Sequence, residues 1–325
     1  GWITSYLPSV SSVTYNGNRS YDVTFGSTVA SYLTPGMRVR TSRTSSAPTT
    51  VFSLDGSNDY YSKASPSGFS FTDDFVCSAW VRLTSNAAST IVSKWNGTSG
   101  FTLDINSSGQ VQFVGFNGGA GNNSYVLSYQ SIPLNKWVHI TAQLDMSSFT
   151  ATTTTSYVMF DGVDVPCSVA RNGTNPTALV QAGNLEIGGR NGGGQPFPGQ
   201  ITDVMIFNAK VTQATMRGYM SQTPSGSETS LISAYKNGST TDLNTGNANN
   251  LTAQNGATTS SSYAPYTVDA NGTPGGTYDY GIVTKVATTT ATVQVPEGCA
   301  IPTSGGVGAV DLSTAEYPYG FRTPG

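Results

Sequence analysis

Charged side chains are scarce in this sequence. Asp, Glu, Lys and Arg make up 10% of its 325 residues, against roughly a quarter in an ordinary globular protein. The net charge is only −3, which excludes broad electrostatic binding to nucleic acid or to an anionic membrane. Disorder is excluded as well, because it goes with low hydrophobicity and high net charge, whereas 37% of these residues are hydrophobic. The chain is expected to fold and to have a polar, nearly neutral surface.

Residues that bind metals or form disulfides are also few. The sequence has one histidine, His139, and three widely separated cysteines, Cys77, Cys167 and Cys299. Zinc sites need closely spaced Cys and His ligands, so zinc is excluded. The odd, scattered cysteines favour free thiols, with Cys77–Cys167 as the pair considered if one disulfide forms.

The residues of the common hydrolases are missing. Glutamates occur only at four isolated positions, and none has a carboxylate partner two or four residues away: Glu186, Glu228, Glu297 and Glu316. A glycosidase needs such paired carboxylates. No G-x-S-x-G motif is present to supply a nucleophile, and His139, within KWVHIT, is interpreted as a packed strand residue. These absences predict a protein that is not an enzyme.

Long apolar runs are absent too. None approaches the ~20 residues that a membrane-spanning helix needs, and the sequence opens without a signal peptide. We therefore expect no membrane insertion and no secretion by the signal-peptide route.

What remains is rich in Val, Thr, Tyr and Phe, which favours strands. Short strands with hairpin turns occupy residues 1–45 and 278–296, and neither end has enough apolar residues for a core of its own. Residues 1–50 and 269–325 are expected to form one small split β-domain, resembling a barrel, with the middle of the chain inserted between them.

The middle, 51–268, reads as about ten strands separated by polar turns, which predicts a two-sheet sandwich. Alternation in Phe75-Cys77-Ala79-Val81 and in Trp137-His139-Thr141 indicates strands with one buried face and one face in water. Residues 210–222 form the one convincing helix, with Thr212 as its N-cap and Gly218 limiting its length.

Two local features have alternative interpretations. The glycine-rich loop in EIGGRNGGGQPFPGQ lacks a following Lys-Ser/Thr and leads into a strand, so it predicts a connection at the end of the sandwich and not a phosphate site. The basic run GMRVRTSR places Arg38, Arg40 and Arg43 on the solvated face of a strand or, alternatively, in a contact between subunits.

Several motifs carry a family resemblance. LDGSNDY, CSAWVRL, NKWVHI, FDG and GQITDVMIFNAKVT follow one another in the order seen in the LamG-like jelly-roll family, within the concanavalin A-like lectin/glucanase superfamily, and the resemblance covers residues 52–222. Residues 231–257 resemble the strand pair that usually precedes LDGSNDY, which suggests a permuted sandwich.

With the stretches LTPGMRVRTSR and YDYGIVTKVATTTATVQVPEGC at its two ends, the whole arrangement also resembles bacteriophage virion proteins that display a LamG-like module from a small β-domain. This resemblance implies a capsid-decorating or tail-fibre component, assembled in the host cytoplasm, with other virion proteins as partners and a homotrimer as the usual assembly. The module would adhere to glycans, many copies giving avidity. The alternatives are a structural cement protein without a ligand and a secreted bacterial lectin or adhesin.

A glycan site would use aromatic rings for the apolar face of a sugar and amides or Arg for its hydroxyls. The predicted ligand-binding residues lie in loops at one end of the sandwich: Trp95, Asn96, Arg190, Asn191, Gln195 and Tyr60. Phe197, Tyr61 and the loop 115–125 are further candidates. No cofactor is predicted. Calcium was weighed because LamG-like modules often bind it, with Asp55, Asp59 and Asp203 as oxygen donors.

Overall fold

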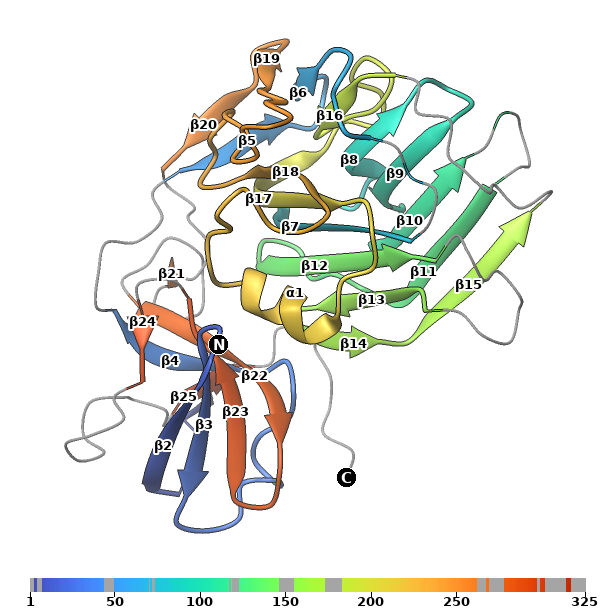
Figure 1. Cartoon of the computed structure of the whole chain (residues 1–325). Coiled ribbons are helices and arrows are strands. Elements are labelled where there is room, and N and C mark those ends of the chain that lie inside the picture. Colours follow the sequence, from blue (N-terminus) through green and yellow to red (C-terminus); the bar gives the residue numbers. More distant parts are fainter. Residues whose placement is uncertain are drawn as a thin grey trace.

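The computed structural model describes residues 3–4, 8–43, 50–69, 71, 74–116, 118, 123–145, 155–172, 183–261, 267–268, 278–296, 299–301 and 314–316. Its strands form three antiparallel sheets, and the one named helix, α1, spans Gln213–Tyr219. Figure 1 shows two of these sheets packed as a sandwich, with the third sheet beside them. The predicted all-β class with a jelly-roll sandwich is confirmed.

The first sandwich layer, here the β7 sheet, faces the terminal part of the molecule. In spatial order it contains β14 (Val163–Val165), β13 (Tyr157–Phe160), β12 (Trp137–Leu144), β7 (Phe75–Leu83), β17 (Pro198–Phe207), β5 (Val51–Asp55) and β20 (Thr258–Ser260), with β18 (Leu231–Tyr235) paired to the second half of β17.

The second layer, the β8 sheet, contains β15 (Cys167–Asn172), β11 (Asn123–Ser131), β10 (Gln110–Phe116), β9 (Gly100–Ile105), β8 (Ser89–Trp95), β16 (Leu185–Ile187), β6 (Tyr60–Lys63) and β19 (Thr252–Gln254). The two layers enclose the main core, which includes Phe75, Phe101 and Phe113. Two strands that follow α1 pair with the first strands of the sandwich, β20 with β5 and β19 with β6.

The third layer, the terminal sheet, draws its strands from both ends of the chain. It contains β1 (Ile3–Thr4), β25 (Thr314–Glu316), β4 (Arg38–Arg43), β22 (Tyr278–Val286), β23 (Thr290–Gln294), β3 (Ser20–Phe25) and β2 (Val10–Gly17), with β21 (Thr267–Val268) beside β22 and β24 (Cys299–Ala300) beside β4. Its own core includes Val23, Val39 and Val293. The domain boundaries 1–50 plus 269–325 and 51–268 stay a prediction.

At its central strands, the second face of the β7 sheet is buried, which corrects the expected pattern. All nine residues of β7 and all eight of β12 are buried. Trp80 and Trp137 pack with Tyr280 and Ile282 of the terminal sheet and with Met220. The alternation in Phe75-Cys77-Ala79-Val81 marks the main-core face of β7 correctly. In β12 it is wrong, because Val138 and Ile140 face the main core and Trp137 lies in the second apolar contact, on the opposite face.

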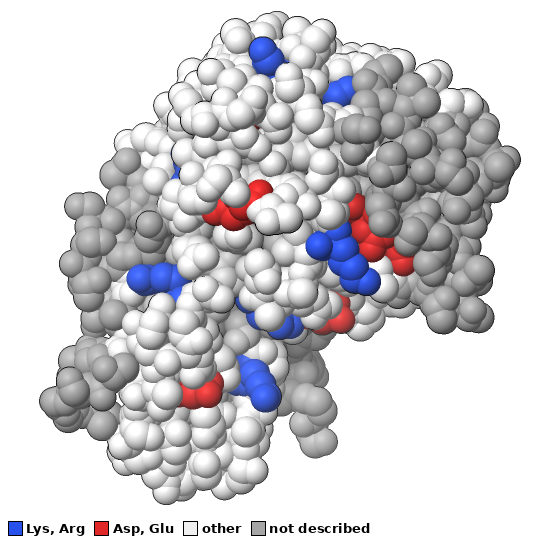
Figure 2. All heavy atoms as spheres, in the orientation of Figure 1, with Lys and Arg blue, Asp and Glu red and all other residues white. Residues whose placement is uncertain are grey.

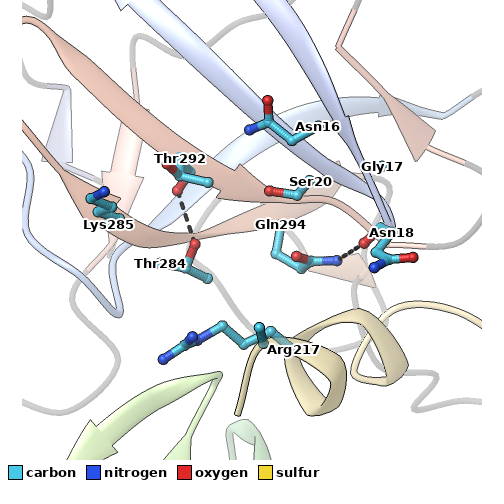
Figure 3. A pocket seen from close by; sticks show the side chains of 10 residues that line it. Asn16, Gly17, Asn18, Ser20, Arg217, Thr284, Lys285, Thr292 and Gln294 are labelled. Carbon is cyan, nitrogen blue, oxygen red and sulfur yellow. Dashed lines mark hydrogen bonds between the residues drawn. The ribbon is translucent and has the colours of Figure 1, made fainter. Parts of the chain in front are cut away.

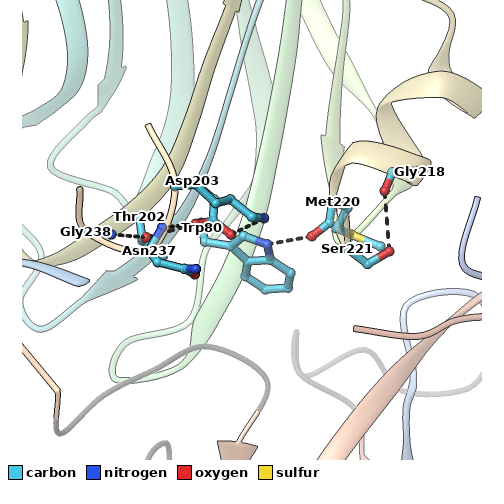
Figure 4. Close-up of polar contacts among 9 residues, drawn as sticks. Trp80, Thr202, Asp203, Gly218, Met220, Ser221, Asn237 and Gly238 are labelled. Carbon is cyan, nitrogen blue, oxygen red and sulfur yellow. Dashed lines mark hydrogen bonds and ion pairs between the residues drawn. The ribbon is translucent and has the colours of Figure 1, made fainter. Parts of the chain in front are cut away.

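Polar contacts join the same two parts of the chain. Gln294 Nε2 donates to the Asn18 carbonyl at 2.5 Å (Figure 3) and to Ser221 Oγ at 2.7 Å. The Trp80 indole N–H donates to the Met220 carbonyl at 2.9 Å (Figure 4). The terminal sheet therefore contacts the sandwich through an interface that combines apolar packing with hydrogen bonds.

Arg38 is part of this interface, so its placement on a solvated strand face or between subunits was wrong. Its side chain is 1% exposed, pairs with Asp161 at 3.1 Å and donates to the Trp137 carbonyl. The guanidinium carbon lies 4.7 Å from the centroid of the Tyr280 ring. The side chains of Arg40 and Arg43 lie outside the described residues.

The visible surface is mostly uncharged, as the composition predicts. Figure 2 shows Lys and Arg in blue and Asp and Glu in red, scattered singly or in small groups among neutral side chains. The three cysteines are free, two of them buried, in agreement with the preference for free thiols.

Candidate functional site

The glycine-rich loop folds over the outer face of the β8 sheet and is held there by Glu186. On β16, Leu185 and Ile187 point into the core, so Glu186 points to the opposite face. Its carboxylate accepts the backbone N–H groups of Gly192 at 2.8 Å and Gly193 at 3.1 Å. Burial raises the pKa of Glu186, and these two hydrogen bonds oppose that shift.

This arrangement explains the loop's glycines. Gly192 and Gly193 both have φ near +86°, a region that favours glycine. Their amides face an anion, as in a phosphate site, but that anion is a carboxylate of the same chain. The loop therefore serves as a connection that Glu186 fixes, in line with the expectation that it is not a phosphate cradle.

Arg190 lies in the same loop and is held from two sides. Its Nη1 pairs with Asp104 Oδ2 at 3.0 Å, and its guanidinium carbon lies 4.9 Å from the centroid of the Trp95 ring. Asp104 in turn accepts the hydroxyls of Thr90 and Thr102, both at 2.7 Å. Burial raises the pKa of Asp104, and Arg190 and the two hydroxyls oppose that shift.

Trp95 supports Arg190, which differs from the predicted role of an open ring for sugar stacking. The guanidinium covers one part of the indole, and Phe116 lies 5.6 Å away between ring centroids. The group available for a ligand at this position is the Arg190 side chain, which is 19% exposed.

The other predicted residues surround this point. Asn96 Oδ1 accepts the backbone N–H groups of Thr98 and Ser99, so Asn96 shapes its own turn. Asn191 is exposed with φ of +50°, and its side-chain amide lies beside Gly97 in that turn. Trp95, Asn96, Arg190 and Asn191 are thus brought together.

Tyr60 and Gln195 lie on the far side of the loop. The Tyr60 ring packs so closely on Gly193 that a Cβ there would come within 2.9 Å of it. Gln195 has φ of +49° and gives its carbonyl to the N–H of Thr90 at 2.9 Å. Both residues shape the loop and flank the Arg190 position.

Two further candidates were wrong. Phe197 and Tyr61 are buried in the main core, at 0% and 2% exposure, so neither contacts a ligand at the surface. Of the candidate loop 115–125, residues 117 and 119–122 lie outside the described residues. Gly118 donates its N–H to Ser99 Oγ at 3.1 Å.

Two of the three aspartates weighed for calcium, Asp203 and Asp55, have other roles. Asp203 sits at the bulge of β17 with φ of +54°, pairs with Lys236 at 2.6 Å and accepts the N–H of Asn237 at 2.9 Å (Figure 4). Asp55 accepts the N–H of Ser57 at 2.8 Å, and that bond is the main reason its pKa is lowered. Within the described ranges, no three His, Cys, Asp or Glu side chains gather as metal ligands would.

His139 is a packed residue. Its ring is 1% exposed and lies edge-on to Trp80, with 5.2 Å between centroids. Burial, together with the charge of Lys236, lowers its pKa to about 3.

In the described part of the chain, no helix combines the length and the apolar character that crossing a membrane requires.

Sequence reasoning missed the supporting carboxylates, Asp104 and Glu186. In FTLDI the apolar residues Phe101, Leu103 and Ile105 alternate with polar ones. This alternation is enough to predict that Asp104 faces away from the core. Its partner Arg190 could not be predicted, because it lies 86 positions away.

Comparisons with known proteins address the fold. A family model described as "Concanavalin A-like lectin/glucanases superfamily" matches residues 55–217. No curated protein matches the chain.

Solved structures give more distant similarities. A Bacteroides ovatus protein whose description proposes carbohydrate binding is 20% identical with a TM-score of 0.48, and the match covers 66% of this chain and 60% of that one. A heptameric SAP-like pentraxin from Limulus polyphemus is 13% identical with a TM-score of 0.47, over 66% of this chain and 95% of that one. The chain thus spans 60% of the length of the Bacteroides protein.

Proposed function

Because the chain belongs to the concanavalin A-like lectin/glucanases superfamily, we propose that it is a non-enzymatic, lectin-like protein that binds a glycan at Arg190. The observation that carries this proposal is the fixed guanidinium. Asp104 holds one edge of it and Trp95 supports its face, while part of the side chain remains exposed. Arg binds the hydroxyls and carboxylates of a ligand through its planar fork of donors.

The surroundings of Arg190 suit a glycan better than an apolar ligand. Asn191 adds an exposed amide beside it, and Tyr60 and Gln195 flank the loop. Glu186 fixes the loop before a ligand arrives, which lowers the ordering cost of binding. Single contacts at one partly exposed guanidinium would be weak, so many copies would supply the affinity.

A glycan array with the full chain tests this site. Asn191→Gly removes the amide and keeps a residue that adopts positive φ, while Arg190→Lys keeps the charge beside Asp104 and removes the fork. Each is expected to weaken binding several-fold, since a lost charge-assisted or buried hydrogen bond is worth about 1–3 kcal/mol.

The matched control is Asn237→Gly. Asn237 is also exposed, has φ of +53° and precedes a glycine, so this variant should bind as the parent does. Equal binding by all four proteins would contradict the site at Arg190 and leave a structural cement role.

We further propose that the protein is a virion component, as a decoration or tail-fibre subunit, acting as a homo-oligomer with three copies expected. The interface at Trp80, Trp137 and Tyr280 supports this proposal, because a rigid joint lets the terminal sheet anchor the chain while the sandwich faces outward. Immunogold electron microscopy of source particles, with antibody to residues 51–268, should label heads or tails. Absence of label on particles would favour a secreted lectin.

A further inference from the structure

A second polar site lies at the junction of the two parts of the chain. The hairpin turn between β2 and β3, strands β22 and β23, and helix α1 enclose a hollow of about 460 Å³, a volume within the range of small-molecule sites. Figure 3 shows Arg217 reaching from α1 beneath β22 and β23, toward the side where Thr284 and Lys285 lie.

Two cations line this hollow and no carboxylate does. They are Arg217 from the sandwich and Lys285 from the terminal sheet. Within the ranges that the structure describes, neither has a carboxylate partner. Asp22 does not line the hollow but contacts a residue that does, since its Oδ1 accepts the Thr292 hydroxyl at 2.6 Å. The hollow is therefore suited to an anion.

Arg217 is held in position without being neutralised. Its Nε donates to the Gly162 carbonyl at 2.6 Å and its Nη2 to Gln213 Oε1 at 3.3 Å. Both acceptors are uncharged, so the guanidinium keeps its full charge. Since the group is planar, these two bonds fix the direction of its remaining N–H donors.

The base of the hollow is also fixed before a ligand binds. Gln294 connects the Asn18 carbonyl to Ser221 Oγ. Gly17 and Asn18 both have positive φ in the tight hairpin turn, and a Cβ on Gly218 would come within 3.2 Å of Asn18 Cβ. Atoms from both parts of the chain meet closely here, so the hollow needs the whole chain.

Apart from Gly17 and Ala214, the rest of the lining consists of residues with amide or hydroxyl side chains, and it includes no aromatic ring: Asn16, Asn18, Ser20, Thr284, Thr292 and Gln294. Amides and hydroxyls both donate and accept hydrogen bonds, as sugar hydroxyls do. We propose that this hollow binds an acidic saccharide, whose carboxylate pairs with Arg217 and Lys285 and whose hydroxyls meet the amides and hydroxyls. This site is separate from Arg190 and does not depend on it.

Isothermal titration calorimetry of the full chain with glucuronic acid tests the proposal, with glucose as the neutral match and sulfate as the simple anion. Glucuronic acid should bind and glucose should not. Lys285→Glu should weaken binding about tenfold or more, because a charge-assisted contact becomes repulsive. Lys285 is exposed, so this change should leave the fold intact.

Lys210→Glu is the matched control, since Lys210 is equally exposed and lies outside the hollow. It changes the net charge by the same amount and should bind as the parent does. Arg190→Lys should also bind as the parent does, which separates this site from the glycan site proposed above.

Three results would overturn the proposal. They are no binding of glucuronic acid, equal weakening by Lys210→Glu and Lys285→Glu, and sulfate binding as tightly as glucuronic acid, which would mean an adventitious ion only.

Discussion

Three buried polar residues, Arg38, His139 and Asp161, lie together at β12. Asp161 pairs with Arg38 through one carboxylate oxygen and accepts the backbone N–H of His139 through the other, at 2.8 Å. Asp161 and Gly162 form the two-residue turn between β13 and β14, both with positive φ, which is the geometry of a type I′ hairpin. The Asp-Gly pair in FDG is a local signal for such a turn. The sequence does not predict the Arg38 pair, because that contact spans 123 positions.

The buried His139 should make stability depend on pH. Its pKa is lowered to about 3 in the folded chain, against about 6.5 when unfolded. Between these values the unfolded state binds a proton that the folded state does not. Stability is therefore complete above about pH 6.5 and falls by up to about 1.4 kcal/mol per pH unit below it.

Urea unfolding at pH 7, 6, 5 and 4 checks this prediction. His139→Gln keeps a polar side chain of similar size and removes the titration, so its free energy of unfolding should decline less steeply than that of the parent. Asp104 and Glu186 titrate alike in both proteins and cancel in the comparison. Parallel pH profiles would contradict the assignment to His139.

Among the elements, α1 shows what local signals determine. The sequence predicts a helix over 210–222 with Thr212 as its N-cap, and Thr212 Oγ1 does accept the N–H of Thr215 at 3.2 Å. The helix ends earlier, at Tyr219. Gly218 lies inside the helix, where the close approach of Asn18 leaves little room for a side chain. The local sequence does not show why this position is a glycine, because Asn18 is distant in the chain.

Removing the N-cap gives a test at this scale. Thr212→Ala should lower the free energy of unfolding by about 1 kcal/mol, because an amide of the first turn loses its acceptor. Thr212→Ser keeps an acceptor and should restore most of the loss. Thermal unfolding of the three proteins measures the effect, and equal values for the alanine and serine variants would argue that the cap contributes nothing.

Strands show where periodicity alone falls short. In FVCSAWVRL every second residue, starting from Phe75, lies in the main core. Val76 and Trp80, on the other face of the strand, are apolar as well. Such nearly continuous apolar strands are typical of sheets covered on both sides. The motif identifies β7 correctly, but what covers its second face depends on β22, about two hundred positions away.

For the whole molecule, the buried Arg38–Asp161 pair links the stability of the terminal sheet to that of the sandwich. Arg38 comes from the terminal sheet and Asp161 from the sandwich, and both are almost fully buried. Removing one member of a buried pair leaves an uncompensated charge, at a cost of about 3–5 kcal/mol. The charged pair itself is worth much less than that.

Arg38→Met should therefore lower the free energy of unfolding by about 3–5 kcal/mol, while Arg38→Met with Asp161→Asn should recover part of the loss. Lys210→Met, at an exposed position, is the control and should change little. Chemical unfolding of the four proteins gives these values. A single variant as stable as the control would show that the pair is not buried in solution.

The adjacency of β5 and β20 has a consequence for folding. Val51 and Ser260 are partners in the sheet, so the two points where the chain passes between the terminal sheet and the sandwich lie about 5 Å apart. Pairing β4 with β22, as at Val39 and Gly281, would otherwise require closing a very long loop. If the sandwich forms first, that loop shortens to the segments 40–50 and 261–280, and its closure entropy falls accordingly. The inserted part would then act as the nucleus on which the two chain ends assemble.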